Sequence, residues 1–134
     1  MIIYTDGGCT NSNQKNQSIR QLIMVATDDS GEVLVERIIN GGSNNIAELL
    51  AVLYALEWVM EEFILSDIVI KTDSKIAIGW IESGKFGKHL NNRELVAEIR
   101  EKIAALCKDI RVSFEWVPRE KSLAGHYIEN KYRL

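Results

Sequence analysis

The order of strand-like and helix-like segments constrains the fold of this chain more than any other feature. Short apolar or β-branched runs come first, at residues 2–5, 21–27 and 32–39. The turn sequence DDSG at residues 28–31 joins the last two runs as a hairpin, and DGG at residues 6–8 predicts a tight turn after the first. We therefore expect the chain to begin with three antiparallel strands.

The rest of the chain alternates between helix and strand patterns. Asn45 is a candidate N-cap for a helix over residues 46–63, whose apolar positions repeat every 3.6 residues. A strand, two helices, a strand ended by the only proline and a last helix follow, at residues 66–72, 74–82, 92–106, 111–117 and 123–132. The order βββαβααβα predicts an α/β fold: a mixed five-stranded sheet, three strands antiparallel and then two parallel, with helices on both faces.

Length and composition favour a single domain over residues 1–134. A chain of 134 residues with 46% hydrophobic content can build one core. No apolar run approaches the ~20 residues that span a bilayer, and the N-terminus lacks the pattern of a signal peptide. Cys9 and Cys107 lie far apart without metal-ligand spacing, which favours reduced thiols. We expect a cytoplasmic monomer with no membrane or protein partner.

The net charge of −3 provides no overall basic surface for nucleic acid. Lysines nevertheless flank Asp73, at Lys71 and Lys75, and Arg119 and Lys121 flank a late glutamate. These cations form either a local basic rim around an acidic pocket or an ordinary solvated surface, and composition alone does not decide between them.

Three acidic residues stand where a strand or helix meets its neighbour: Asp6, Glu48 and Asp73. Each has a local explanation: Asp6 as a turn residue, Glu48 as the third position of a capping box begun by Asn45, and Asp73 as the cap of the helix from Ser74. However, Asp6 and Asp73 both follow the carboxyl end of a predicted strand, where open α/β sheets bind ligands. If those strands are neighbours, all three carboxylates face one crevice, which predicts a divalent metal site.

Four blocks of the sequence resemble, in order and spacing, those of ribonuclease H type 1: YTDGG, SNNIAEL, IKTDS and EWVPRE. The resemblance covers nearly the whole chain, and the predicted element order is also that family's. It implies a metal-dependent endonuclease that hydrolyses the RNA strand of RNA/DNA hybrids, with Asp6, Glu48 and Asp73 as the first three metal-binding carboxylates. It also implies contacts to the RNA strand and its 2′-hydroxyl groups at Cys9, at Asn11 or Ser12, and at Asn44 with Asn45.

The implied chemistry suits these residue types. Phosphodiester hydrolysis needs an activated water, charge stabilisation at phosphorus and a stabilised leaving oxygen. Two Mg²⁺ ions about 3.5 to 4 Å apart supply all three, and Mg²⁺ prefers hard oxygen ligands. Asp6 would bridge the two ions, and Glu48 and Asp73 would hold one each or share the water and leaving-group side.

The last helix departs from the family pattern, which usually places a fourth acidic residue there. Ungapped continuation from EWVPRE puts His126 at that position. Histidine is a poor Mg²⁺ ligand and a better one for Mn²⁺. Glu129, one helical turn further, is the alternative ligand. His126 either serves at the active site or is an ordinary helix-surface residue. Many family members also carry a histidine on a flexible loop, and here either His126 takes over that role or the role is absent.

Two further features bear on substrate and function. Residues 83–92 replace a basic, Trp-rich protrusion found in some family members, and Lys85 and Lys88 there form a small phosphate-binding patch or an exposed loop. The altered fourth position leaves open a second function, a nucleic-acid-binding module that has lost turnover. Nucleases of the same fold that act on other nucleic acids form a third class.

Overall fold

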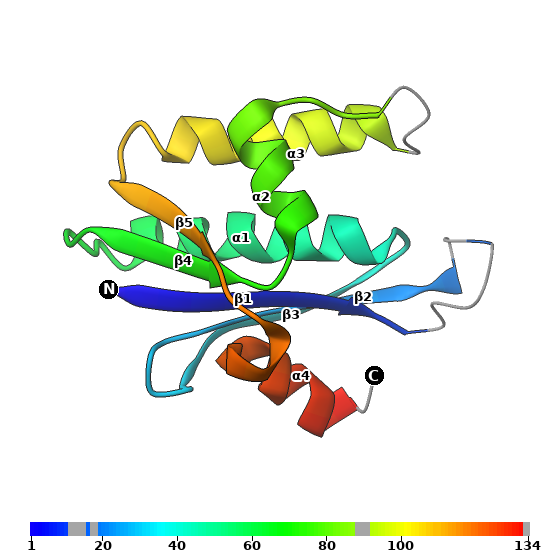
Figure 1. The fold of residues 1–134 in the computed structure, drawn as a ribbon, viewed down its shortest axis with the longest axis horizontal. Helices are drawn as coiled ribbons and strands as arrows, with labels where there is room; N and C mark the ends of the chain where they lie inside the picture. Colours follow the sequence, from blue (N-terminus) through cyan, green and yellow to red (C-terminus); the bar gives the residue numbers. More distant parts are fainter. Residues whose placement is uncertain (11–15, 17–18, 88–91, 133–134) are drawn as a thin grey trace.

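A five-stranded mixed sheet forms the centre of the protein (Figure 1). The computed structural model describes residues 1–10, 16, 19–87 and 92–132. The strands lie in the order β3-β2-β1-β4-β5. They are β1 (Ile2–Cys9), β2 (Gln21–Thr27), β3 (Val33–Asn40), β4 (Ile68–Thr72) and β5 (Val112–Trp116). The first three pair antiparallel and the last two run parallel to β1, which confirms the predicted sheet.

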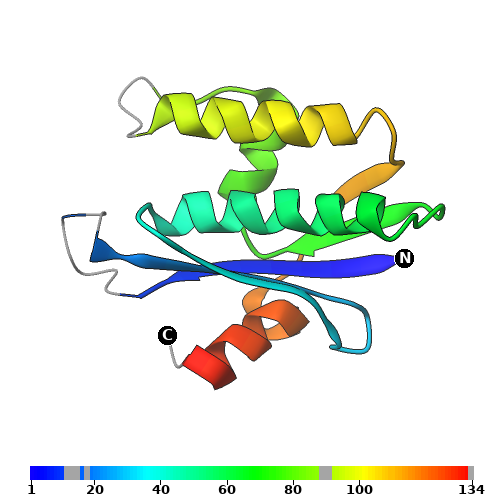
Figure 2. The same ribbon diagram turned by 180° about the vertical axis from the view of Figure 1, so that it is seen from behind.

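The helices cover both faces of the sheet, as predicted (Figures 1 and 2). They are α1 (Asn44–Glu61), α2 (Lys75–Ser83), α3 (Arg93–Leu106), the 3₁₀ turn η2 (Arg119–Lys121) and α4 (Leu123–Tyr132). Helices α1, α2 and α3 lie on one face over the main core, whereas α4 lies on the other face over a small apolar cluster. Within the described ranges, no helix combines the length and apolarity needed to cross a bilayer.

Strand β1 is longer than the sequence predicted. It continues through Asp6, Gly7 and Gly8 to Cys9, pairing with β2 as far as the Cys9–Leu22 pair. The prediction of a turn at Asp6 was therefore wrong, because ladder pairing with β2 outweighs the turn preference of the two glycines. Asp6 lies inside a strand, not after one.

Helix α1 begins earlier than predicted, and its cap is Ser43. The Ser43 hydroxyl accepts a hydrogen bond from the Ile46 backbone N–H at 3.3 Å. Gly41 and Gly42 precede it with φ of 83° and 125°, a left-handed turn that separates β3 from the helix. The capping-box interpretation of Glu48 with Asn45 was therefore wrong, since Glu48 lies beyond the capping positions.

Gly7 is the point at which β1 and α1 touch backbone to backbone. A Cβ atom at Gly7 would lie 2.2 Å from the Ala47 carbonyl carbon and 2.4 Å from the Glu48 backbone nitrogen. Neither of these atoms can rotate away, so only glycine fits. The contact holds the first turns of α1 against the middle of the sheet.

We predict that Gly7→Ala destabilises the protein by about 3 kcal/mol, the upper end for an overpacked core, because α1 must move away from β1. Urea unfolding measures the change. Gly79→Ala is the matched control: this position in α2 has no atom within 4 Å of an added Cβ, so alanine should stabilise by about 0.5 to 1 kcal/mol. Equal effects of the two substitutions would contradict the contact.

Candidate active site

The structure brings Asp6, Glu48 and Asp73 together. Each offers a carboxylate oxygen within 4.8 Å of the other two. The parallel register explains two of the three positions: Ile2 pairs with Val69 and Tyr4 with Lys71, so continuing it brings Asp6 level with Asp73, just past β4. Glu48 arrives from the other layer, because the Gly7 contact places the start of α1 directly beside β1.

None of the three carboxylates serves the local role that the sequence also allowed. Asp6 lies in a strand and Glu48 lies beyond the α1 cap. The cap of α2 is Ser74, whose hydroxyl accepts from the Ala77 backbone N–H at 3.0 Å, so Asp73 is not a cap. Their convergence therefore has no explanation in capping or turns.

Burial makes this cluster energetically expensive. Asp6 is 0% exposed and Glu48 8% exposed. Both oxygens of Asp6 and Oε2 of Glu48 are buried and accept no hydrogen bond from any described group. Buried, unpaired carboxylates are rare, because burial in a low-dielectric interior disfavours the charged form. Several hard oxygen donors around one point fit Mg²⁺ or Mn²⁺.

Two of these carboxyl groups, Asp6 and Glu48, have a pKa above the ordinary range. Burial raises the pKa of Asp6 to about 6; the neighbouring Glu48 side chain and the charge of Arg119 oppose the rise, while the charge of Asp73 adds to it. Burial also raises the pKa of Glu48 well above normal, and the negative charges of Asp6 and Asp73 raise it further. Without a bound cation, the pair retains a proton to higher pH than an ordinary carboxyl group does.

Arg119 provides a positive charge inside the acidic cluster. Its Nη1 lies 3.2 Å from Asp73 Oδ2 and 3.7 Å from Asp6 Oδ2. Partial burial acts to lower the pKa of Arg119, but Asp6, Asp73 and, more weakly, Glu129 together raise it. The sequence analysis placed Arg119 only on a possible basic rim. The EWVPRE block was the available signal, but nothing in it shows that the guanidinium reaches the carboxylates.

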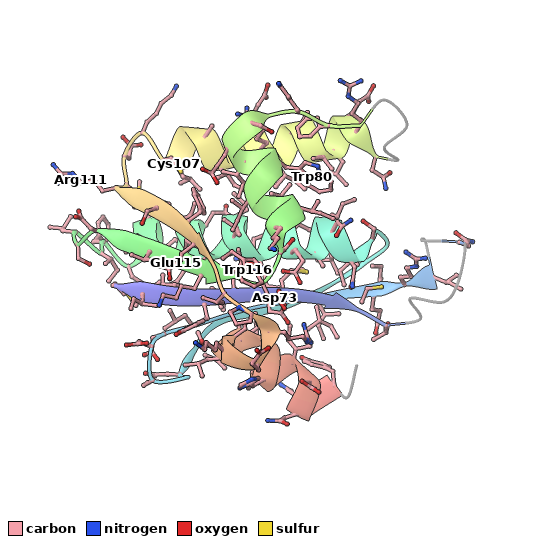
Figure 3. All side chains as sticks on the ribbon, viewed as in Figure 1. Asp73, Trp80, Cys107, Arg111, Glu115 and Trp116 are labelled. Atoms are coloured by element: carbon pink, nitrogen blue, oxygen red, sulfur yellow. The ribbon has the colours of Figure 1, made fainter. Side chains whose placement is uncertain are left out.

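Trp116 also belongs to this site, although the sequence analysis did not include it. The indole Nε1–H donates to the Asp73 carbonyl oxygen at 3.1 Å. The Val117 N–H donates to the Thr72 carbonyl at 2.9 Å. Figure 3 shows Asp73 and Trp116 next to each other between α2 and α4. The end of β5 therefore holds the segment that presents Asp73.

A cavity of about 210 Å³ opens beside the carboxylates, between β1, α1, η2 and α4. Two of the predicted substrate contacts, Cys9 and Asn44, line it together with Glu48 and Arg119. Asn45 is half-buried in the first turn of α1, and Lys85 is exposed just after α2. Three further predicted contacts lie outside the described residues: Asn11, Ser12 and Lys88.

Helix α4 covers the cluster without adding a carboxylate to it. A Cβ atom at Gly125 would lie 3.5 Å from Asp6 Oδ2. His126 is half-buried and Glu129 is exposed, and neither joins the group formed by the other three in the described part of the chain. Glu129 acts on the site through its charge on Arg119. The role of a fourth ligand thus stays a prediction for both residues.

Comparison with known proteins identifies the family. The RNase H family model matches residues 1–131, so the chain belongs to the RNase H family. A comparison with curated proteins found no significant match.

Solved structures of RNase H1 enzymes share the fold. LC11-RNase H1, isolated from compost by a metagenomic approach, is 28% identical with a TM-score of 0.69, covering 95% of this chain and 90% of that chain. The structure of LC11-RNase H1 in complex with RNA/DNA hybrid is 27% identical with a TM-score of 0.64, covering 90% of this chain and 87% of that chain. The N-terminal RNase H domain of rv2228c from Mycobacterium tuberculosis is 25% identical with a TM-score of 0.66, covering 96% of this chain and 87% of that chain.

We predict that Asp6→Asn stabilises the metal-free protein at neutral pH. The pKa of the Asp6 carboxyl group is raised from 3.8 to about 6 in the folded protein. Ionising this group therefore does not destabilise the fold below pH 4, and its full destabilising effect is present above pH 6. Removing this charge should therefore increase the free energy of unfolding by on the order of 1 to 3 kcal/mol at pH 7.5 and by almost nothing at pH 4.

Thermal unfolding in EDTA at both pH values measures this difference, with exposed Asp67→Asn as the control that should show no such trend. Mn²⁺ at pH 7.5 should raise the midpoint of the wild type and not of Asp6→Asn. A wild type more stable than Asp6→Asn at pH 7.5 in EDTA would contradict the electrostatic argument.

Proposed function

We propose that this protein is a metal-dependent endonuclease that hydrolyses the RNA strand of RNA/DNA hybrids. The observation that carries the proposal is the group of Asp6, Glu48 and Asp73, whose oxygens lie within 4.8 Å of one another. Both oxygens of Asp6 and Oε2 of Glu48 are buried without a hydrogen-bond donor among the described residues. Family membership and the hybrid complex of the similar LC11-RNase H1 support the choice of substrate.

The carboxylates of Asp6, Glu48 and Asp73 would hold the metal ions. We expect two ions when the substrate is bound. Asp6 is fully buried, and its carboxylate would hold the ions together with those of Glu48 and Asp73. Bound Mg²⁺ or Mn²⁺ would supply Lewis-acid activation of water and stabilisation of the phosphorus centre and leaving oxygen. Trp116 and Val117 keep Asp73 in place through backbone hydrogen bonds, which preorganises its carboxylate.

The chain's other groups would select the substrate. Cys9 and Asn44 line the cavity next to Glu48, where a strand with 2′-hydroxyl groups would be distinguished from DNA. Arg119 offsets part of the carboxylate charge in the absence of a cation. It also lines the cavity, where its guanidinium would contact a phosphate oxygen of the substrate once a cation neutralises the carboxylates. Both cysteines are free thiols, which is consistent with a monomer acting in the reducing cytoplasm.

One observation favours a second candidate, a hybrid-binding module with weak or no turnover. Gly125 is the α4 residue that faces Asp6, and the metal-binding group of the described residues includes no α4 side chain. A three-carboxylate site binds divalent ions less tightly than a four-carboxylate one, because fewer charges attract them. The enzyme and the module differ in turnover, not in binding.

We predict that the wild type cuts only the RNA strand of a labelled hybrid in Mg²⁺ or Mn²⁺, and that Asp6→Asn lowers kcat by roughly 10³-fold or more, a loss of about 4 kcal/mol of transition-state stabilisation. Asp67→Asn, an exposed aspartate of an Arg111 ion pair, is the control and should keep full activity. RNA and DNA duplexes serve as substrate controls. Hybrid binding without cleavage in either metal would favour the binding module.

A second prediction concerns the fourth position. If His126 contributes to catalysis, His126→Ala should lower kcat about a hundredfold or more, the low end of the effect of losing one acid–base group. Glu129→Ala should change the apparent metal constant instead, because Glu129 acts through charge. Steady-state rates over a Mn²⁺ and Mg²⁺ titration separate the two. Wild-type behaviour of both variants would show that neither residue serves as the fourth ligand.

A further inference from the structure

Glu36 on β3 accepts hydrogen bonds from three side chains of α4. Tyr127 Oη donates to Oε1 at 2.8 Å, Lys131 Nζ donates to Oε2 at 2.7 Å, and Tyr132 Oη donates to Oε2 as well. Lys131 also donates to Tyr127 Oη at 3.3 Å and lies over both tyrosine rings. We call these four residues the Glu36 cluster. The Glu36 carboxylate thus ties the C-terminal half of α4 to β3 through hydrogen bonds.

The cluster is electrostatically matched, unlike the active site. Partial burial acts to raise the pKa of Glu36, but Lys131, Tyr132 and Tyr127 together lower it. The hydrogen bond to Glu36 raises the pKa of Lys131. The charged forms of both groups are therefore favoured across the neutral range.

Cross-strand register places Glu36 in one row with Asp6. Asp6 pairs with Val25 on β2, and Val25 pairs with Glu36 on β3. Directly paired residues of antiparallel strands project from the same face, so this row runs beneath α4. Adjacent strands lie about 4.8 Å apart, which puts the two acidic positions about 10 Å from each other.

Helix α4 spans this row from end to end. Gly125 lies over Asp6, since its added Cβ would be 3.5 Å from Oδ2. Ala124 and Ile128 pack on Val25 and Ile23 in the small apolar cluster, and the Glu36 cluster fixes the other end. Among the described residues, this apolar cluster has four buried members and three partly buried tyrosines, far fewer than the main core, so polar contacts contribute a larger share of what holds α4.

We propose that Glu36 is a positioning residue that sets the angle of α4 across the sheet and thereby the closure of α4 over Asp6. This inference rests on the proposed function and deepens it. Removing the Glu36 contacts frees the C-terminal half of α4 to tilt about the apolar cluster. Gly125, Ile128 and η2 then shift relative to Asp6, which loosens the packing around the carboxylates and the orientation of Arg119.

A purely structural role predicts something different. In that case, losing the cluster would lower the unfolding midpoint while the folded molecules kept wild-type metal affinity and kcat. A positioning role changes metal affinity and kcat in fully folded protein. It changes KM for the hybrid less than kcat, because Cys9 on β1 and Asn44 on α1, which line the cavity, do not move with α4.

The test compares Glu36→Gln with the double variant Tyr127→Phe and Tyr132→Phe, which keeps both rings and removes only the hydroxyl groups. Glu98→Gln is the matched control, a surface glutamate in an ion pair with Lys102 on α3. Mn²⁺ affinity is measured by isothermal titration calorimetry, and kcat and KM by hybrid cleavage, at a temperature well below every unfolding midpoint.

We expect both cluster variants to weaken Mn²⁺ binding and lower kcat by about tenfold, the low end for loss of groups that orient ligands, with KM within about twofold and Glu98→Gln unchanged. Wild-type Mn²⁺ affinity and kcat in both variants would overturn the positioning role. If the wild type binds Mn²⁺ but cuts no substrate, the proposed function fails and the Mn²⁺ affinities alone decide on Glu36. A wild type that does not bind Mn²⁺ overturns both.

Discussion

The backbone contact between Gly7 and Ala47 is the constraint on which the rest of this structure depends. It allows α1 to lie directly on β1 and so delivers Glu48 to Asp6 from a different layer of the fold. The parallel pairing of β1 with β4 then brings Asp73 level with them. A side chain of any size at Gly7 would separate the layers, and the three carboxylates would no longer meet.

The resulting cluster destabilises the empty protein and favours a bound cation. Burial raises the pKa of Asp6 and of Glu48, the charge of Asp73 raises both further, and the guanidinium of Arg119 compensates only in part. Asp6 and Glu36, the acidic residues at the two ends of the row under α4, differ in their hydrogen bonding. Within the described part of the chain, Glu36 has three hydrogen-bond donors, whereas Asp6 has none. This contrast separates a residue that holds the fold from one that is poised for a ligand.

The sequence predicted the sheet and the three carboxylates because strand and helix periods and motif order are local signals. It misplaced Asp6 in a turn, since the pairing of Gly7 and Gly8 with β2 depends on a partner distant in the chain. It missed the reach of Arg119 into the cluster and the row from Asp6 to Glu36, because strand register is not visible in one strand's residues. The choice of Ser43 over Asn45 as cap depends on the turn at Gly41 and Gly42.

The central claim is that the buried carboxylates form a divalent cation site. Anomalous diffraction from crystals soaked in Mn²⁺ tests it most directly, because the signal locates the ion without reference to activity. The account predicts an anomalous peak within bonding distance of Asp6 and at least one of Glu48 and Asp73, with Arg119 displaced from Asp6. Crystals that take up Mn²⁺ only elsewhere, with Arg119 still between Asp6 and Asp73, would contradict it.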